Sequence, residues 1–211
     1  MAKQVAHESK NPLTPMRLSV QSFQRKFNSN DIDVYQKIEE YSKTLIQQID
    51  TMSSIASAFS NFAKMPAQQN ETLNVVEVVN LALDIFTEDY LLFECASQEI
   101  IAKLDRTQLI RIITNLVKNA IQSIIHSQNP VIRICLDDDE DNVIVTVSDN
   151  GHGITEENKP KVFEPKFTTK TSGMGLGLPM IKNIIETYKG SIDFDSVEGS
   201  GTIFKVVLPK S

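Results

Sequence analysis

Residues 143–153 read Val-Ile-Val-Thr-Val-Ser-Asp-Asn-Gly-His-Gly, an apolar alternating segment that ends in an acid and two glycines. The alternation over 143–148 predicts a half-buried β-strand. Asp149, at the end of this strand, can accept a hydrogen bond from an exocyclic amino group. Gly151 and Gly153 allow close approach to the backbone. A plain Asp-Gly turn is the simpler explanation of this motif taken alone.

The sequence around this segment predicts an α/β sandwich, because strand-like and helix-like patterns follow one another there. We expect strands at 131–136, 143–148, 191–196 and 202–208, and helices at 75–86, 105–126 and 178–188. The acidic run 137–142 is expected to be a solvated hairpin turn between the first two strands.

The first 66 residues follow a different pattern, with no glycine. Apolar side chains in 31–63 recur every seven positions, the spacing of a coiled-coil-like seam, at Ile38, Leu45, Met52 and Phe59. A second helix over 5–27 and the short connection 28–33 predict an antiparallel helical hairpin. Because two helices cannot bury their seams fully, we expect a homodimer that forms a four-helix bundle.

Composition and charge narrow the classes of protein. The overall class is α+β, with a helical hairpin at 1–66, a polar linker at 64–71 that contains Pro66, and an α/β domain at 67–211. The net charge of −6 argues against non-specific nucleic-acid binding. No apolar run is long enough to span a bilayer. Cys95 and Cys135 are expected to be reduced core residues of a cytoplasmic protein.

The N-terminal helix carries a possible nucleophile. His7 is followed directly by Glu8, and Asn11 lies one helical turn further on. A neutral imidazole is a competent nucleophile when a carboxylate orients or takes its other proton. Asn11 could orient a water molecule toward a group carried on His7. A zinc-binding helix is excluded, because position 11 would then have to be histidine.

Two further motifs point to anion or metal binding. Asn115 and Asn119 share one face of the expected helix 105–126, and amide oxygens suit Mg²⁺, although such a pair alone is weak evidence. Alternating glycines open the last long helix, where backbone N–H groups and the helix dipole favour an anion, at Gly173, Gly175 and Gly177. Before them, 162–170 is expected to form a mobile lid anchored by Phe163, with Lys170 in reach of phosphates. The hydroxyl of Thr202 could close the pocket.

Taken in order, these motifs resemble the H, N, G1, F and G2 boxes of two-component sensor histidine kinases. The phrase Ala-His-Glu-Ser-Lys-Asn-Pro-Leu-Thr-Pro at 6–15 is closest to nitrogen-regulation kinases, and 67–211 looks like a Bergerat-type ATP-binding domain. The sequence departs from the family pattern at three positions: Ser9, Gln122 and Lys166 replace an apolar, a basic and an aromatic or apolar residue. None of these changes removes a group that the chemistry needs.

The resemblance implies a role for each motif. His7 would accept the γ-phosphoryl group of ATP, Glu8 would act as base, Asn11 would serve phosphatase action, and Asn119 would ligate Mg²⁺. The remaining expected nucleotide-site residues are Asn115, Lys118, Asp149, Gly151, Gly153, Phe163, Thr169, Lys170, Gly173, Gly175, Leu176, Gly177, Leu178 and Thr202. Asp149 would read the adenine amino group.

The implied partner is a response regulator, whose aspartate would receive the phosphoryl group. We expect a catalytic portion of a longer sensor that could be membrane-anchored, with no membrane or nucleic-acid contact of its own. Two alternatives remain: an ATPase or serine kinase of the same fold that never phosphorylates His7, and a dimeric scaffold with a vestigial nucleotide site.

Overall fold

The computed structural model describes residues 17, 20–21, 35–36, 38–46, 49, 68–125, 127–164 and 175–211. The chain divides into two compact units, Met1–Met65 and Pro66–Ser211. In the first unit the described residues are helical, which agrees with the heptad pattern there. The dimeric bundle stays a prediction. Among the described residues, no helix is both long and apolar enough to cross a bilayer.

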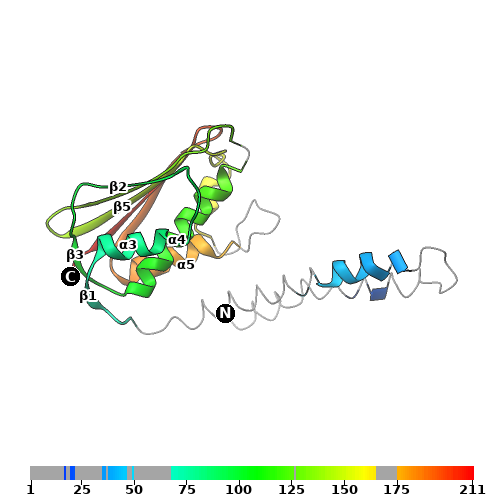
Figure 1. Ribbon diagram of the computed structural model, residues 1–211, viewed down its shortest axis with the longest axis horizontal. Helices are drawn as coiled ribbons and strands as arrows, with labels where there is room; N and C mark the ends of the chain where they lie inside the picture. The colour runs from blue at the N-terminus through cyan, green and yellow to red at the C-terminus, as the bar shows by residue number, and fades with distance from the viewer. Residues whose placement is uncertain are drawn as a thin grey trace. The chain divides into compact units, whose positions relative to one another are not determined.

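The second unit is built on a five-stranded sheet with strand order β2-β4-β5-β7-β6 (Figure 1). The strands are β2 (Leu91–Cys95), β4 (Ile132–Asp138), β5 (Asn142–Asp149), β6 (Ser191–Val197) and β7 (Gly201–Pro209). Only the β2–β4 pair is parallel; the other pairs are antiparallel. The expected hairpin β4–β5 and the expected pair β6–β7 are therefore present, and β5 lies at the centre.

Three helices form a layer over one face of this sheet (Figure 1). They are α3 (Val75–Leu83), α4 (Arg106–Ser123) and α5 (Gly177–Thr187), and a 3₁₀ turn spans Lys159–Lys161. Helix α4 contacts β4, β5 and β7, while α5 contacts β6 and β7. The two-layer α+β architecture expected for this domain is confirmed.

The core lies between these two layers, because each element buries one face. Alternate residues of the central strands point inward, and a stripe of α4 packs on them. The fully or nearly buried residues of this contact are Leu109, Ile112, Ile113, Leu116, Val117, Ile134, Val143, Val145, Val147, Phe204 and Val206.

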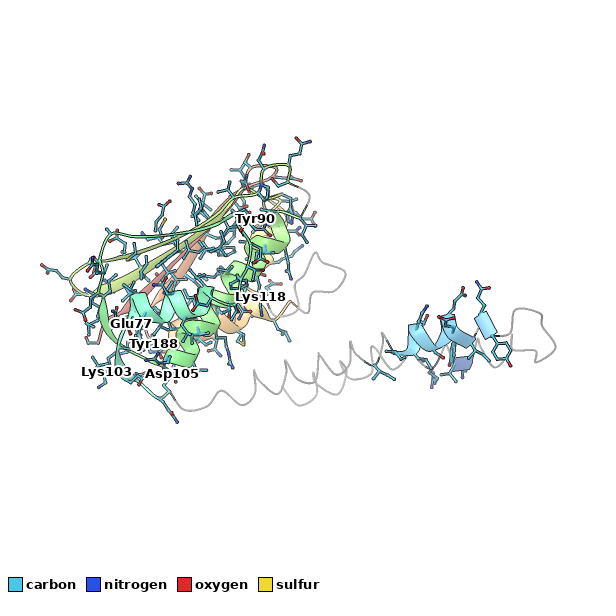
Figure 2. The ribbon with its side chains drawn as sticks, in the orientation of Figure 1. Glu77, Tyr90, Lys103, Asp105, Lys118 and Tyr188 are labelled. Carbon is cyan, nitrogen blue, oxygen red and sulfur yellow. The ribbon has the colours of Figure 1, made fainter. Side chains whose placement is uncertain are left out.

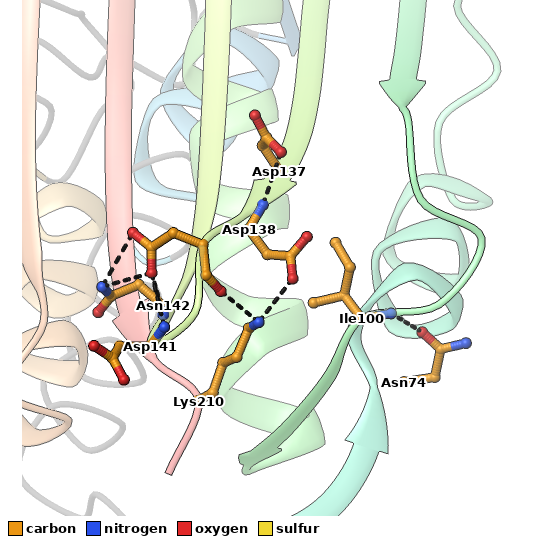
Figure 3. A network of polar contacts seen from close by, with 8 residues as sticks. Asn74, Ile100, Asp137, Asp138, Asp141, Asn142 and Lys210 are labelled. Atoms are coloured by element: carbon orange, nitrogen blue, oxygen red, sulfur yellow. Dashed lines mark hydrogen bonds and ion pairs between the residues drawn. The ribbon is translucent and has the colours of Figure 1, made fainter.

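A second, two-stranded sheet was not predicted. Strands β1 (Glu71–Asn74) and β3 (Ile101–Leu104) pair antiparallel, and each has four residues, too short for a clear alternating pattern. Asn74 caps α3: its Oδ1 accepts hydrogen bonds from Val76 N at 3.1 Å and from Ile100 N at 3.2 Å (Figure 3).

Three expectations need correction. The helices expected at 75–86 and 105–126 end earlier, at Leu83 and Ser123. The segment 64–71, expected to be a linker, ends inside the folded domain, because β1 begins at Glu71. The cysteines are partly exposed rather than in the core, because Cys135 lies on the outer face of the sheet beside Glu94 and Cys95 lies on the edge strand β2.

The C-terminal residues close the domain through Lys210 (Figure 3). Its ammonium group donates to Asp138 Oδ2 at 2.7 Å and to the Asp139 carbonyl at 2.5 Å. Its backbone N–H donates to the Asp141 carbonyl, and its carbonyl accepts from Lys103 N. One residue thus connects β7, the acidic turn and β3.

Replacing Lys210 with Met should lower the free energy of unfolding by about 1 kcal/mol, since a half-buried ion pair and one further hydrogen bond are lost. Urea unfolding followed by circular dichroism measures this change. Lys205→Met on the exposed outer face of β7 is the matched control. Equal midpoints for the two variants would contradict the contribution of the Lys210 contacts.

Candidate functional site

One face of α4 carries a polar stripe over three successive turns. Asn115, Asn119 and Ser123 are each four residues apart, so they share this face. By the rise of an α-helix the stripe is roughly 12 Å long. All three side chains are partly exposed, whereas Leu116 and Val117 between them are fully buried. The stripe is therefore not part of the packed core and is available for a ligand.

Asp149 meets the C-terminal end of this stripe. Its Oδ1 accepts hydrogen bonds from Ser123 Oγ at 2.6 Å and from Gly151 N at 2.9 Å. The Thr202 backbone N–H also interacts with the carboxyl group. Asp149 is the last residue of β5 and lies opposite Thr202 of β7, so the sheet register positions it. Three hydrogen bonds do not exhaust the roughly four lone-pair sites of a carboxylate, which can still accept from a ligand.

Burial raises the pKa of the Asp149 carboxyl group. The hydrogen bonds from Ser123 and Gly151 act in the opposite direction, because they favour the charged form. The group thus combines a desolvated position with donors that hold its orientation. Such a combination is typical of a binding or catalytic group.

The loop after Asp149 contacts both α4 and the β6–β7 turn. A Cβ atom on Gly151 would collide with the side chain and backbone of Ser123, so only glycine fits this approach. Gly153 has a φ of 68° and lies against the Val197 carbonyl. The carbonyl of His152 accepts a hydrogen bond from Gly199 N at 2.8 Å.

Thr202 lies at the site, but its hydroxyl is engaged. The expectation that this hydroxyl closes the pocket is therefore corrected. Thr202 is buried, and its Oγ1 lies 2.9 Å from Ser196 Oγ. Ser196 Oγ in turn accepts from Ile154 N and donates to the Gly201 carbonyl. Thr202 therefore supports Asp149 through its backbone and the loop through Ser196.

The N-terminus of α5 approaches the other end of the α4 stripe. A Cβ atom on Gly177 would lie 2.9 Å from Asn115 Oδ1. The Asn115 amide is oriented by its Nδ2, which donates to the Arg111 carbonyl at 2.8 Å. Leu176, at the N-cap position of α5, makes no side-chain capping bond. The first N–H groups of this eleven-residue helix can therefore face an anion near Asn115.

Phe163 is an anchor and packs on the sheet. Its ring makes an edge-to-face contact with Phe194, with 5.8 Å between centroids, and Lys182 Nζ lies 5.0 Å above it. This contact fits the expectation that Phe163 anchors the start of the expected lid 162–170. The ring itself contacts β6 and α5 residues.

Several expected site residues cannot be placed. His7, Glu8, Asn11, Thr169, Lys170 and Gly173 lie outside the described residues. Lys118 is exposed and lies next to the stripe of α4, not on it (Figure 2). The structure places Asn115 and Asn119 on one face of α4, with Asp149, Gly151, Gly153 and Thr202 near one end of it and Gly177 near the other, where Gly175, Leu176 and Leu178 flank Gly177 in the chain. Ser123 was missed, although its spacing of four from Asn119 was a usable signal.

The donor set of the stripe fits a metal that is shared with a ligand. Within the described part of the chain, no group of three or more His, Cys, Asp or Glu side chains could hold a metal ion. The amide oxygens of Asn115 and Asn119 are hard donors. Mg²⁺ commonly takes one or two such protein oxygens and completes its shell with water and substrate phosphates.

Replacing Ser123 with Ala should raise the pKa of Asp149 further, because the carboxylate loses a donor that stabilises its charged form. Carbon-13 NMR titration of the aspartate carboxyl groups measures the change. Ser148→Ala is the matched control, since Ser148 faces the outer side of β5. An unchanged Asp149 titration in Ser123→Ala would contradict the role of this hydrogen bond.

Comparisons with known proteins agree with this geometry. Residues 104–211 match the family model "Histidine kinase-, DNA gyrase B-, and HSP90-like ATPase", and residues 1–68 match the "His Kinase A (phospho-acceptor) domain". A putative NtrY-like sensor histidine kinase of Rickettsia conorii is 34% identical over 210 residues, which are 98% of this chain and 35% of the relative. The nitrogen regulation protein NtrY of Azorhizobium caulinodans is 28% identical over 218 residues, covering 99% of this chain and 28% of the relative.

Solved structures show the same fold. The catalytic domain of the histidine kinase ThkA is 34% identical, with a TM-score of 0.60 over 67% of this chain and 96% of that one. ThkA in complex with the response regulator protein TrrA is 26% identical, with a TM-score of 0.72 over 100% of this chain and 61% of that one. The chain spans about a third of the length of the NtrY-like relatives. It belongs to the sensor histidine kinases of two-component systems and carries their ATPase domain.

Proposed function

We propose that this chain uses ATP to phosphorylate His7 and then passes the phosphoryl group to an aspartate of a response regulator. The observation that carries the proposal is the polar stripe of α4, which has the Asp149 carboxylate at one end and the N-terminus of α5 at the other. A ligand lying along it would meet a hydrogen-bond acceptor and an anion-binding helix end. An adenine nucleotide has an amino group and phosphates at its two ends.

Each end of the stripe has a proposed task. Asp149 accepts a hydrogen bond from the adenine amino group, while Gly151 keeps the loop close to α4. The N-terminal N–H groups of α5, with Gly175, Leu176, Gly177 and Leu178 before or at its start, hold phosphate oxygens. Asn119, with Asn115 beside it, holds Mg²⁺, which neutralises charge on the phosphates when bound. Thr169, Lys170 and Gly173 belong to the proposed lid, and Lys118 supplies a nearby positive charge.

The chemical step is a substitution at phosphorus. A ring nitrogen of His7 forms a bond to the γ-phosphorus, the bond from this phosphorus to the bridging oxygen of the β-phosphate breaks, and ADP leaves. Glu8 takes the proton from the other ring nitrogen. Positioning and charge neutralisation supply most of the rate in such transfers.

The partner is a response-regulator receiver domain. The similar kinase ThkA has been solved in complex with the response regulator protein TrrA, which supports a partner of this class. The match of 1–68 to the phospho-acceptor domain supports a homodimer through 1–66. We further propose that Asn11 orients water when the kinase acts as a phosphatase on its regulator. We also propose that this part of the sensor is located in the cytoplasm.

His7→Gln should abolish protein-bound, acid-labile phosphate after incubation with labelled ATP, because the amide cannot act as the nucleophile. The variant should still bind ATP, as measured by calorimetry. Asn119→Ala is the complementary variant, which should lose both labelling and Mg²⁺-dependent ATP binding. Acid-labile label on His7→Gln would refute the nucleophile assignment. Acid-stable label, or ATP turnover without label, would favour an ATPase or serine kinase.

Asp149→Asn should weaken ATP binding by roughly tenfold to a hundredfold, since a hydrogen bond to a charged acceptor is worth about 1.5–3 kcal/mol. Inosine triphosphate, which lacks the adenine amino group, is the matched ligand. The wild-type protein should prefer ATP, and the variant should bind the two nucleotides alike. A preserved preference for ATP in Asp149→Asn would rule out this role of Asp149.

A further inference from the structure

Two residues that precede β1, Gln69 and Asn70, are bound to the ATPase domain by the cap residues of two helices. Gln69 N donates to Asp105 Oδ2 at 2.9 Å. The Tyr188 hydroxyl accepts from Asp105 N at 2.9 Å and donates to Asn70 Oδ1 at 3.1 Å. Figure 2 shows Asp105 and Tyr188 close together at one end of the domain. We call Gln69, Asn70, Asp105 and Tyr188 the linker latch.

Asp105 serves two segments at once. Its Oδ1 caps α4 by accepting from Gln108 N at 3.1 Å, while its Oδ2 holds the linker backbone at Gln69. Asp105 is 8% exposed, so its carboxylate is largely shielded from water. The Tyr188 hydroxyl is protonated at neutral pH and can donate, and burial raises its pKa further. The start of α4 is therefore tied directly to the chain that comes from the helical unit.

The bonds of the latch are partly offset by an unpaired group beside it. Within the described part of the chain, the buried Gln108 Oε1 has no hydrogen-bond partner, and Gln108 is the residue whose N–H donates to Asp105. The Gln68 side chain interacts with the Tyr188 hydroxyl. An unpaired buried polar atom costs about 1–3 kcal/mol, so Gln108 Oε1 offsets part of the stabilisation from the latch bonds. Gln69 and Asn70 are exposed as residues, and water can replace their bonds when they release.

We propose that the linker latch opens and closes in solution, and that Asp105 and Tyr188 are positioning residues for phosphorylation of His7. The inference rests on the proposed function. When the latch is closed, residues 68–70 belong to the ATPase domain and the free tether between nucleotide and His7 is shorter. A shorter and more restricted tether raises the effective concentration of one reacting group at the other.

Asp105→Asn separates the latch from the helix cap. Asparagine caps helices as well as aspartate does, so the bond from Gln108 N is kept. Its amide nitrogen then replaces Oδ2 and faces Gln69 N–H, so a donor meets a donor. Tyr188→Phe removes the other bonds of the latch. Tyr90→Phe, which makes the same change at the far end of the domain in Figure 2, is the matched control.

In the full chain, amide hydrogen exchange at Gln69, followed by NMR, should accelerate at least about tenfold in Asp105→Asn, because opening then costs less. The rate constant of His7 labelling at saturating ATP should fall on the order of threefold to tenfold in Asp105→Asn and Tyr188→Phe. The dissociation constant for ATP should stay unchanged, and Tyr90→Phe should match the wild type. A stability loss alone would not produce this split.

Unchanged exchange at Gln69 in Asp105→Asn would show that the latch does not hold the linker. Faster exchange with an equal or higher labelling rate would overturn the positioning role. Absence of His7 labelling in the wild-type protein would instead reject the proposed function and, with it, the positioning role. Protection of Gln69 in that protein would still establish the latch as a structural contact.

Discussion

The site depends on one desolvated carboxylate at the end of the central strand. Asp149 is partly buried, so its charge requires protein donors in place of the water that it has lost. Ser123 comes from α4, Gly151 from the loop that follows β5, and the Thr202 backbone from β7. Three elements far apart in sequence must therefore converge, and the strand order with β5 beside β7 under α4 allows this.

Helix α4 carries three polar features of the domain along its length. Its N-cap residue Asp105 holds the linker, its middle turns present Asn115 and Asn119, and its last residue Ser123 holds Asp149. The opposite face packs on the sheet through fully buried residues such as Ile113 and Leu116. Since interiors are close-packed, the helix cannot rotate or slide without a cost in packing. The spacing between the linker contact, the amides of Asn115 and Asn119 and the Asp149 carboxylate is thus set by one rigid element.

The sequence predicted much of this domain where periodicity was strong. Strands β4, β5, β6 and β7 and the three helices were expected near their observed positions, because their apolar residues alternate or recur at helical spacing. Strands β1 and β3 were missed, since four residues carry too few repeats. The cysteines were misjudged for a related reason: a short apolar run does not tell which face of a strand is covered, and Cys135 lies on the open one.

The order of the motifs and the chemistry of their residues were readable from the sequence alone. An aspartate after a strand, glycines before a helix and paired asparagines are local features, and the family resemblance rests on them. Only the tertiary structure shows the partners of Asp149, the hydrogen bond between the Thr202 and Ser196 hydroxyls, and the hydrogen bond from Tyr188 to the linker residue Asn70. Each of these contacts joins residues whose spacing in the chain carries no signal, because only the packing of α4 and α5 on the sheet brings them together.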